Sequence, residues 1–211
     1  MYPMVSSNAV FIHEKEGDDM KIRRGWILSL CAVLLVTVLA GCSAKEKETV
    51  IGSGMWPEYT FQSAVDTAVT IVYGTAGEKS ETKSRDISLN PEKPTLLYYR
   101  DVPMEVKELP KGEKGSDGTV IYQEQGGETD TQIFITEGLE EVEPGKEYIL
   151  FLNEIGAILS PALLLPVENG EVKTSGGLVP DSAKDSNGKA PDTMTVEAYL
   201  EAVESAVRSS S

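Results

Sequence analysis

The stretch EYILFL, residues Glu147–Leu152, decides the fold of this chain. Its last five residues are apolar without interruption. A run of this length without alternation predicts a strand that is covered on both faces, or the centre of a closed barrel. We expect either Leu150 and Leu152 or Ile149 and Phe151 to be fully buried.

Shorter strand signals surround this stretch. Residues 96–109 alternate between apolar and polar side chains, and this period of two predicts a half-buried strand. The dipeptide Asn169-Gly170 predicts a two-residue hairpin. Further strands are expected at residues 68–73, 119–124, 131–136, 163–167 and 171–174. The pattern predicts a mainly β protein, a small antiparallel barrel of about five to seven strands.

Two helices are expected at the ends of this strand series. Residues 60–67 can form a short N-terminal helix of about two turns. Near the C-terminus, Thr195 fits an N-cap. Apolar side chains then recur at helical spacing, at Val196, Tyr199, Leu200, Val203 and Val207. We expect this amphipathic helix to dock on the barrel, because its acidic opposite face disfavours the alternative, insertion into an anionic membrane.

Residues 20–42, MKIRRGWILSLCAVLLVTVLAGC, have the three parts of a secretory signal. Basic residues open the segment, a mostly apolar run of 15 residues follows at 26–40, and Gly41 precedes Cys42. The ending Leu-Ala-Gly-Cys resembles the lipobox of bacterial lipoproteins. That resemblance implies cleavage between Gly41 and Cys42 and a diacylated Cys42 as the first residue of the mature protein. An uncleaved transmembrane helix is the alternative, but a bilayer span needs about 20 apolar residues.

Residues 1–19 do not fit a secretory start, because acidic residues stand directly ahead of the basic segment. The tripeptide Lys15-Glu16-Gly17 can be encoded by a ribosome-binding sequence at a suitable spacing from Met20. We therefore expect Met20 to be the translation start and residues 1–19 to be an untranslated leader. An unusually long signal n-region is the alternative.

The remainder of the chain divides into a tether and one domain. Residues 42–55 are largely polar and contain Gly-Ser-Gly, which predicts a lipidated, flexible tether. Residues 56–208 have the length of a single domain, which we expect to hold the barrel and the C-terminal helix. This length is too short for a two-lobed solute-binding lipoprotein.

The composition excludes several classes of function. The chain has two cysteines, Cys31 and Cys42, and one histidine, His13. From Ser43 onward there is thus neither a free thiol nor an imidazole, which excludes Ser-His-Asp, Cys-His and zinc sites there. The 34 acidic and 19 basic residues give a net charge of −15, and the part after Cys42 carries all of it. This acidity argues against nucleic acid or an anionic lipid surface as partner.

Three segments carry a resemblance to known proteins: AVTIVYG at 68–74, VKELPKG at 106–112 and PGKEYILFL at 144–152. Their order resembles a group of uncharacterised bacterial secreted and lipid-anchored proteins. It also weakly resembles the OB-like barrel of netrin and tissue-inhibitor modules, which implies an OB-like fold over residues 68–174. The cysteines of the animal modules are missing here, and their protease inhibition is not implied because Cys42 is lipidated.

An acidic turn is the first candidate site. It contains Glu137, Glu140, Glu141 and Glu143, among which a glycosidase could hold its carboxylate pair. A run of glutamates in a turn is more often simply solvated, and this is our interpretation.

Residues 181–188 are the second candidate, because Asp185 and Asn187 have part of the spacing of a calcium loop. The first and last ligand positions of that loop would be Ala183 and Met194. Neither side chain binds calcium, so we expect a polar turn and no metal.

Aromatic side chains are the third candidate. Trp56 can stack on a ligand, but we expect it to cap the core. Tyr98 and Tyr99 can form a carbohydrate platform, but we expect one of them in the core and the other at the surface.

These features predict a lipid-anchored cell-envelope protein on the extracytoplasmic face of the membrane. We expect a non-enzymatic binding or protein-interaction module without a cofactor, and the alternative is a carboxylate-based hydrolase of envelope polymers. Its expected partners are the membrane, through the lipid on Cys42, and a protein of the envelope. The polar loops at 75–95 and 176–192 are the expected contact surface.

Overall fold

The uninterrupted apolar run is strand β8 (Glu147–Leu152), and five of its six residues are buried. Strands β2 (Thr70–Ala76) and β9 (Leu164–Glu168) flank it on either side, both antiparallel to it. Phe151 and Ile149 are entirely buried. The prediction of a central strand covered on both faces is confirmed.

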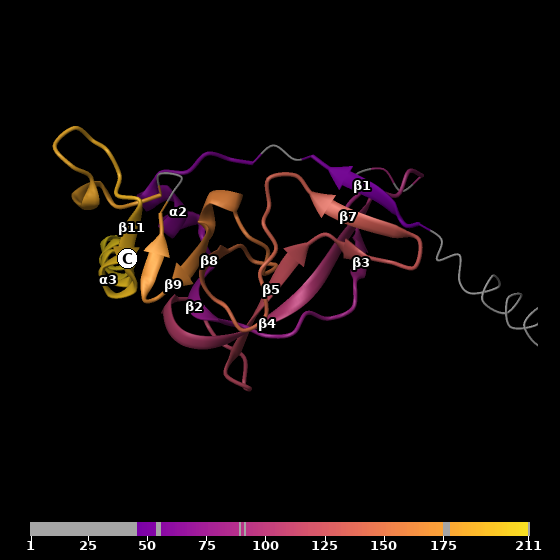
Figure 1. Ribbon diagram of the computed structural model, residues 1–211, viewed down its shortest axis with the longest axis horizontal. Coiled ribbons are helices and arrows are strands. Elements are labelled where there is room, and N and C mark those ends of the chain that lie inside the picture. The colour runs from indigo at the N-terminus through magenta and orange to yellow at the C-terminus, as the bar shows by residue number, and fades with distance from the viewer. Residues whose placement is uncertain (1–45, 54–55, 89, 91, 175–177, 211) are drawn as a thin grey trace, which may run out of the picture. The chain divides into compact units, whose positions relative to one another are not determined.

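The computed structural model describes residues 46–53, 56–88, 90, 92–174 and 178–210 (Figure 1). The residues from Glu46 onward form one compact unit. The expected leader (1–19), the signal peptide (20–41), its cleavage site at Gly41 and the lipid site Cys42 lie outside the described residues.

Most strands belong to one antiparallel sheet, whose order is β11-β10-β9-β8-β2-β4-β3, with β5 on the other edge of β4. The strands not yet bounded are β3 (Lys83–Asp86), β4 (Leu96–Lys111), β5 (Thr119–Gln125), β10 (Glu171–Lys173) and β11 (Thr193–Thr195). Strand β4 is long enough to pair with β2, β3 and β5 along its length. The predictions of strands near 68–73, 96–109, 119–124, 163–167 and 171–174 are confirmed.

A second sheet has the order β1-β7-β6 and is formed by β1 (Glu48–Gly52), β7 (Gln132–Thr136) and β6 (Gly127–Glu128). Strand β1 runs parallel to β7. The prediction of a flexible tether over 42–55 is therefore wrong for β1. Its centre, Thr49-Val50-Ile51, is β-branched throughout and suits a strand.

The strands are arranged as open sheets (Figure 1). Among the described residues, no strand pairing closes either sheet into a barrel. What is confirmed is the coarser prediction: a mainly β protein with a short N-terminal helix and a C-terminal helix.

Two helices pack together at one end of the unit (Figure 1). Helix α2 (Phe61–Thr67) has Thr60 as its N-cap, and Thr60 forms a capping box with Ser63. Helix α3 (Val196–Ser209) begins at the N-cap Thr195. The rings of Phe61 and Tyr199 meet edge to face at 5.9 Å. Four of the five apolar residues predicted to face the core from α3 are buried, and the fifth, Val207, is partly buried. Neither described helix is long and apolar enough to span a membrane.

Short turns complete the chain. Single turns of 3-10 helix lie at Pro161–Leu163 and Asp181–Ala183. Between β9 and β10, Asn169 and Gly170 have φ values of 54° and 78°, which is the two-residue turn that the sequence predicts.

A β-bulge interrupts the antiparallel pairing of β2 with β4. The register between the two strands shifts on each side of Tyr73, next to Gly74. A Cβ on Gly74 would lie 2.4 Å from the carbonyl oxygen of Glu105. Only glycine lets the two backbones approach this closely.

Candidate functional site: a buried charge cluster

Two charged side chains lie opposite each other within the antiparallel sheet. Arg100 of β4 and Glu124 of β5 are register partners, and Arg100 Nη2 lies 2.7 Å from Glu124 Oε2. Glu124 has the same strand parity as Val120 and Tyr122, which are buried. The ion pair thus continues a row of core side chains.

Glu124 is entirely buried and accepts from donors of three segments. Besides Arg100, the backbone N–H of Val142 donates to it at 2.7 Å, and Lys79 Nζ lies at 2.9 Å. Lys79 comes from the connection between β2 and β3, and Val142 from the one between β7 and β8. A buried carboxylate needs such partners because its loss of hydration costs several kcal/mol.

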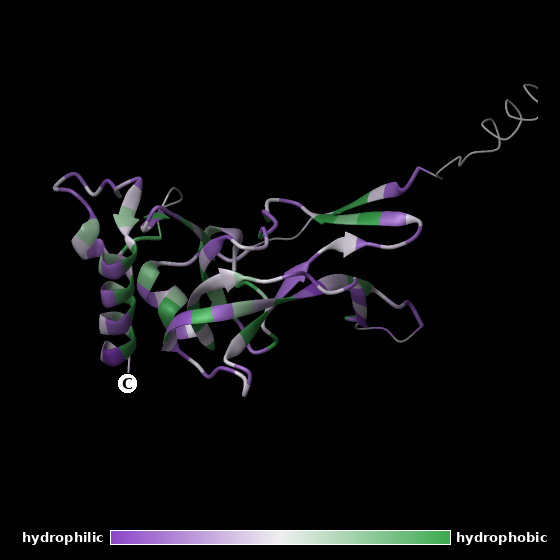
Figure 2. Ribbon diagram, turned by 60° about the horizontal axis from the view of Figure 1, so that its bottom comes forward, coloured by the Kyte–Doolittle hydropathy of each residue, from purple (hydrophilic) through white to green (hydrophobic). Residues whose placement is uncertain are grey.

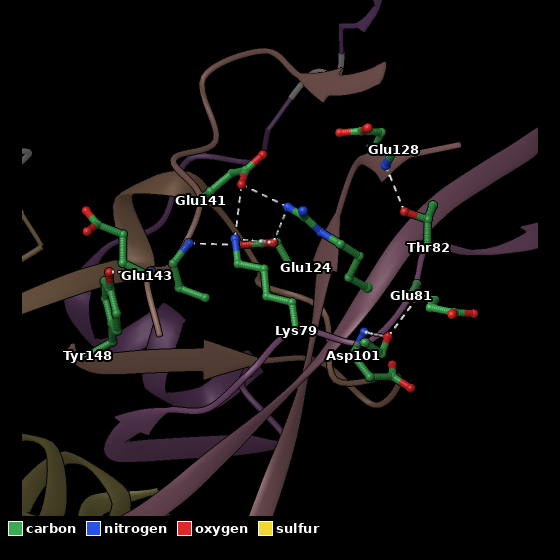
Figure 3. Close-up of polar contacts among 12 residues, drawn as sticks. Lys79, Glu81, Thr82, Asp101, Glu124, Glu128, Glu141, Glu143 and Tyr148 are labelled. Carbon is green, nitrogen blue, oxygen red and sulfur yellow. Dashed lines mark hydrogen bonds and ion pairs between the residues drawn. The ribbon is translucent and has the colours of Figure 1, made fainter. Parts of the chain in front are cut away.

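Glu141 closes the cluster from the solvent side, with 61% of its side chain exposed. It lies 3.0 Å from Lys79 Nζ and 2.9 Å from Arg100 Nη2 (Figure 3). We call Lys79, Arg100, Glu124 and Glu141 the charge cluster. Its two positive and two negative side chains balance.

The cluster changes the proton affinity of its members. Partial burial raises the pKa of the Glu141 carboxyl, but hydrogen bonds from Lys79 and Arg100 outweigh it and hold the pKa below its ordinary value. Burial also opposes the charge of Arg100, but Glu141 and Glu124 outweigh it and raise its pKa. Burial, followed by the charge of Glu124, raises the pKa of the Tyr122 phenol. Glu141 is therefore a poor proton donor at neutral pH.

A cavity of about 580 Å³ lies beside the cluster and has Arg100 in its wall. Its other walls are polar, formed by Lys47, Ser80, Glu81, Thr82, Glu128, Thr129 and Asp130. Lys47 forms an ion pair with Glu128, and the backbone N–H of Glu128 donates to Thr82 Oγ1 at 2.7 Å (Figure 3). Three of the wall residues, Lys47, Thr82 and Glu128, are thus joined to one another.

This arrangement suits a structural role, in which the cluster holds chain segments together, better than a catalytic role. The cluster joins β4 and β5 to two connections that are distant in sequence. Its inner carboxylate is closed to solvent, and both of its cations are neutralised. Within the described part of the chain, no three His, Cys, Asp or Glu side chains form a group that could hold a metal ion.

The glutamates of the predicted acidic turn do not act as one group. Glu141 joins the charge cluster, whereas Glu143 pairs with Lys146 at 2.7 Å. Glu137 and Glu140 are exposed. Glu141 is exposed, as a solvated turn predicts, but it also pairs with Lys79 and Arg100, which was not predicted.

Residues 181–188 form a polar turn, as predicted. Asp185 Oδ1 accepts from the backbone N–H groups of Asn187 and Lys189, at 2.8 and 2.9 Å. Its carboxylate is thus used by the turn itself.

The aromatic candidates pack within the unit. Trp56 is half-buried against the core, as expected of a cap. The Tyr98 ring stacks on Phe134 of β7 at 3.7 Å, so it holds the second sheet to the first. Arg85 lies 4.5 Å from the centre of the Tyr99 ring. Both tyrosines are half-buried, so the prediction of one core and one surface tyrosine is wrong.

The two polar loops expected to form one contact surface are apart. The loop at 75–95 contains β3 and lies at the end of the unit opposite α3, whereas residues 178–192 lie beside α3 (Figure 1). The first loop also contributes Lys79 to the charge cluster. The prediction that the two loops form one contact surface is therefore wrong.

Sequence reasoning missed Lys79, Arg100 and Glu124. A signal was present for two of them: the apolar series at even positions of 96–109 is interrupted at Arg100, and Glu124 extends the inward series of β5. Two opposite charges at core positions of neighbouring strands indicate a buried pair. For Lys79, which lies in a connection, the local sequence has no comparable signal.

No family model matches the chain, and comparisons with proteins of curated function and with solved structures find no similar protein.

Proposed function

We propose that this protein is a lipid-anchored, non-enzymatic binding module on the extracytoplasmic face of a bacterial cell membrane. The observation that carries the proposal is the signal at residues 20–42, with its basic start, its apolar run of 15 residues and its Leu-Ala-Gly-Cys ending. Acyl chains on Cys42 would supply the membrane affinity, because two chains anchor stably where one is marginal.

The charge cluster favours a binding module over the alternative, a carboxylate-based hydrolase. Glu124 and Glu141 are carboxylates that converge, since both contact Lys79 and Arg100. A glycosidase-type acid, however, needs a raised pKa and access to substrate. The pKa of Glu141 is lowered instead, and Glu124 has no exposed surface.

We also propose that the fold is related to the OB-like barrels. Its support is a set of five antiparallel strands: β2 pairs with β4 and β8, β4 continues to β5, and β8 to β9. An OB-fold is a partly open five-stranded barrel. As in other folds of this kind, function would come from loops and surface sites.

Anchoring is tested by Cys42→Ala, with Cys31→Ala as the matched control inside the signal. We expect Cys42→Ala to give unprocessed or released protein and Cys31→Ala to be processed and retained like wild type. The measurement is membrane fractionation together with the size of the protein, with and without an inhibitor of lipoprotein processing. Equal processing and retention of Cys42→Ala and wild type would contradict the anchor.

The absence of catalysis is tested with the purified protein on peptidoglycan, polysaccharide and ester substrates. Turnover that is lost in Glu141→Gln but kept in Glu143→Gln would favour the hydrolase. A pull-down from solubilised envelope with the intact lipoprotein is the complementary experiment for the binding partner.

A further inference from the structure

The second sheet has an apolar outer face. Ile51 of β1 and Ile135 of β7 are register partners and are 65% and 45% exposed. Thr49 and Ile133, also partners, lie on the same face because side chains alternate along a strand. Figure 2 shows hydrophobic residues along both strands. We call these four residues the outer face.

The opposite face of the same sheet is already used. Val50 and Phe134 are register partners there, and Phe134 stacks on Tyr98 of β4. Among the described residues, the sheet packs on the unit through this face, and its β6 edge is also bonded to the unit through the Glu128 N–H and Thr82 Oγ1. Within the described residues, Thr49, Ile51 and Ile135 of the outer face are exposed and Ile133 is half-buried.

The proposed lipid anchor lies a short way along the chain from this face. Strand β1 begins at Glu48, six residues after Cys42. An extended chain spans at most about 3.3–3.6 Å per residue, so Glu48 lies within roughly 20 Å of Cys42 and Ile51 within roughly 30 Å. Because β1 is paired with β7, anchoring at Cys42 would hold the outer face close to the lipid surface at high effective concentration.

We propose that the outer face of the β1–β7 sheet docks onto the lipid surface in which the acyl chains of Cys42 are embedded. This rests on the proposed function. The exposed fractions of Ile51 and Ile135 together correspond to about one whole isoleucine side chain. Burying that much apolar surface shifts an equilibrium by about tenfold to a hundredfold, which is sufficient only for a surface that is already tethered.

The charge of the chain determines which lipids favour this docking. With a net charge of −15, the protein is repelled by anionic headgroups. Docking through isoleucines is therefore strongest on zwitterionic lipid and weakens as anionic lipid is added. A contact made by basic side chains would show the opposite dependence.

The test places a fluorophore on the outer face without removing its isoleucines. The acylated full-length protein carries Thr49→Cys, labelled on this new thiol, in phosphatidylcholine vesicles. The control label is Ser182→Cys, an exposed position in the loop beside α3. We expect iodide to quench the label at position 49 about tenfold less than the label at position 182, as the lower estimate above predicts. Adding phosphatidylglycerol should reduce this protection.

Paired substitutions test which side chains are responsible. Ile51→Ser with Ile135→Ser should abolish the protection of the label at position 49. Ile121→Ser with Ile155→Ser removes two isoleucines that are 45% and 42% exposed elsewhere, and should leave the protection unchanged. Thermal melts of each labelled variant verify that it is folded.

Three results would overturn the proposal. If the protein floats with the vesicles but both labels are quenched equally, the anchor holds and the docking is wrong. If the label at position 49 is protected equally in Cys42→Ala protein released into buffer without vesicles or detergent, a second copy of the chain covers the face. If the protein carries no acyl group and does not float, the proposed anchor is wrong and the docking falls with it.

Discussion

Replacing Glu124 with glutamine should destabilise the protein more than any other single change of a charged side chain in the cluster. Glutamine keeps the shape and can still accept from the backbone N–H of Val142. It removes the negative charge that lies 2.7 Å from Arg100 and 2.9 Å from Lys79. Among the described residues, the partly exposed Glu141 would then be the one anionic partner left to both cations.

The magnitude follows from the burial of the pair. Removing one partner from a buried ion pair costs about 3–5 kcal/mol of unfolding free energy. Glu141 still compensates the cations in part, so we expect Glu124→Gln to lie at the lower end, about 3 kcal/mol. At about 2–4 °C per kcal/mol for a domain of this size, the melting temperature should fall by about 6–12 °C.

The assay is urea denaturation followed by circular dichroism, with Glu143→Gln as the matched control. Among the described residues, the Glu143 carboxylate forms an ion pair only with Lys146, and both side chains are more than half exposed. Its loss should change the unfolding free energy by about 0.5 kcal/mol or less. A loss below about 1 kcal/mol for Glu124→Gln would refute the argument that this carboxylate is buried and ionised among its partners.

Three further predictions concern the sheet. Phe151→Ala should cost about 3–5 kcal/mol in urea denaturation, and a loss below about 1 kcal/mol would mean that β8 is not the central strand. Gly74→Ala should cost about 1–3 kcal/mol, because its Cβ would lie against the carbonyl oxygen of Glu105 and the bulge would have to open; an unchanged melting temperature would contradict this. The hydrogen bond from Lys107 holds the pKa of Glu147 below its ordinary value. Its stabilisation should therefore be present above about pH 4.3 and be lost as the pH falls further, and a pH series of melting temperatures for wild type and Glu147→Gln measures this difference.

The elements that the sequence predicts well have a signal contained in a short stretch of chain. The apolar run of β8, the alternation of β4 and the helical stripe of α3 each show which face is buried. The Asn169-Gly170 turn is equally local, because its positive φ values suit these residue types.

The elements that were missed depend on contacts between distant residues. Strand β1 lies in a polar segment and becomes a strand by pairing in parallel with β7, about eighty residues later. Whether a set of strands closes into a barrel is likewise a matter of long-range register. The charge cluster is predictable in part. Arg100 and Glu124 stand at core-facing positions of predicted strands, whereas Lys79 and Glu141 reach them from connections between strands.

The most direct test of the account is the mass of the N-terminal peptide of the protein extracted from cell membranes. We predict a mature protein that begins at Cys42, seen after trypsin digestion as residues 42–45 with a diacylglyceryl group on the cysteine. An unmodified peptide that continues from Gly41 through Cys42, or a mature N-terminus at another residue, would contradict the lipid-anchored module on which the proposals depend.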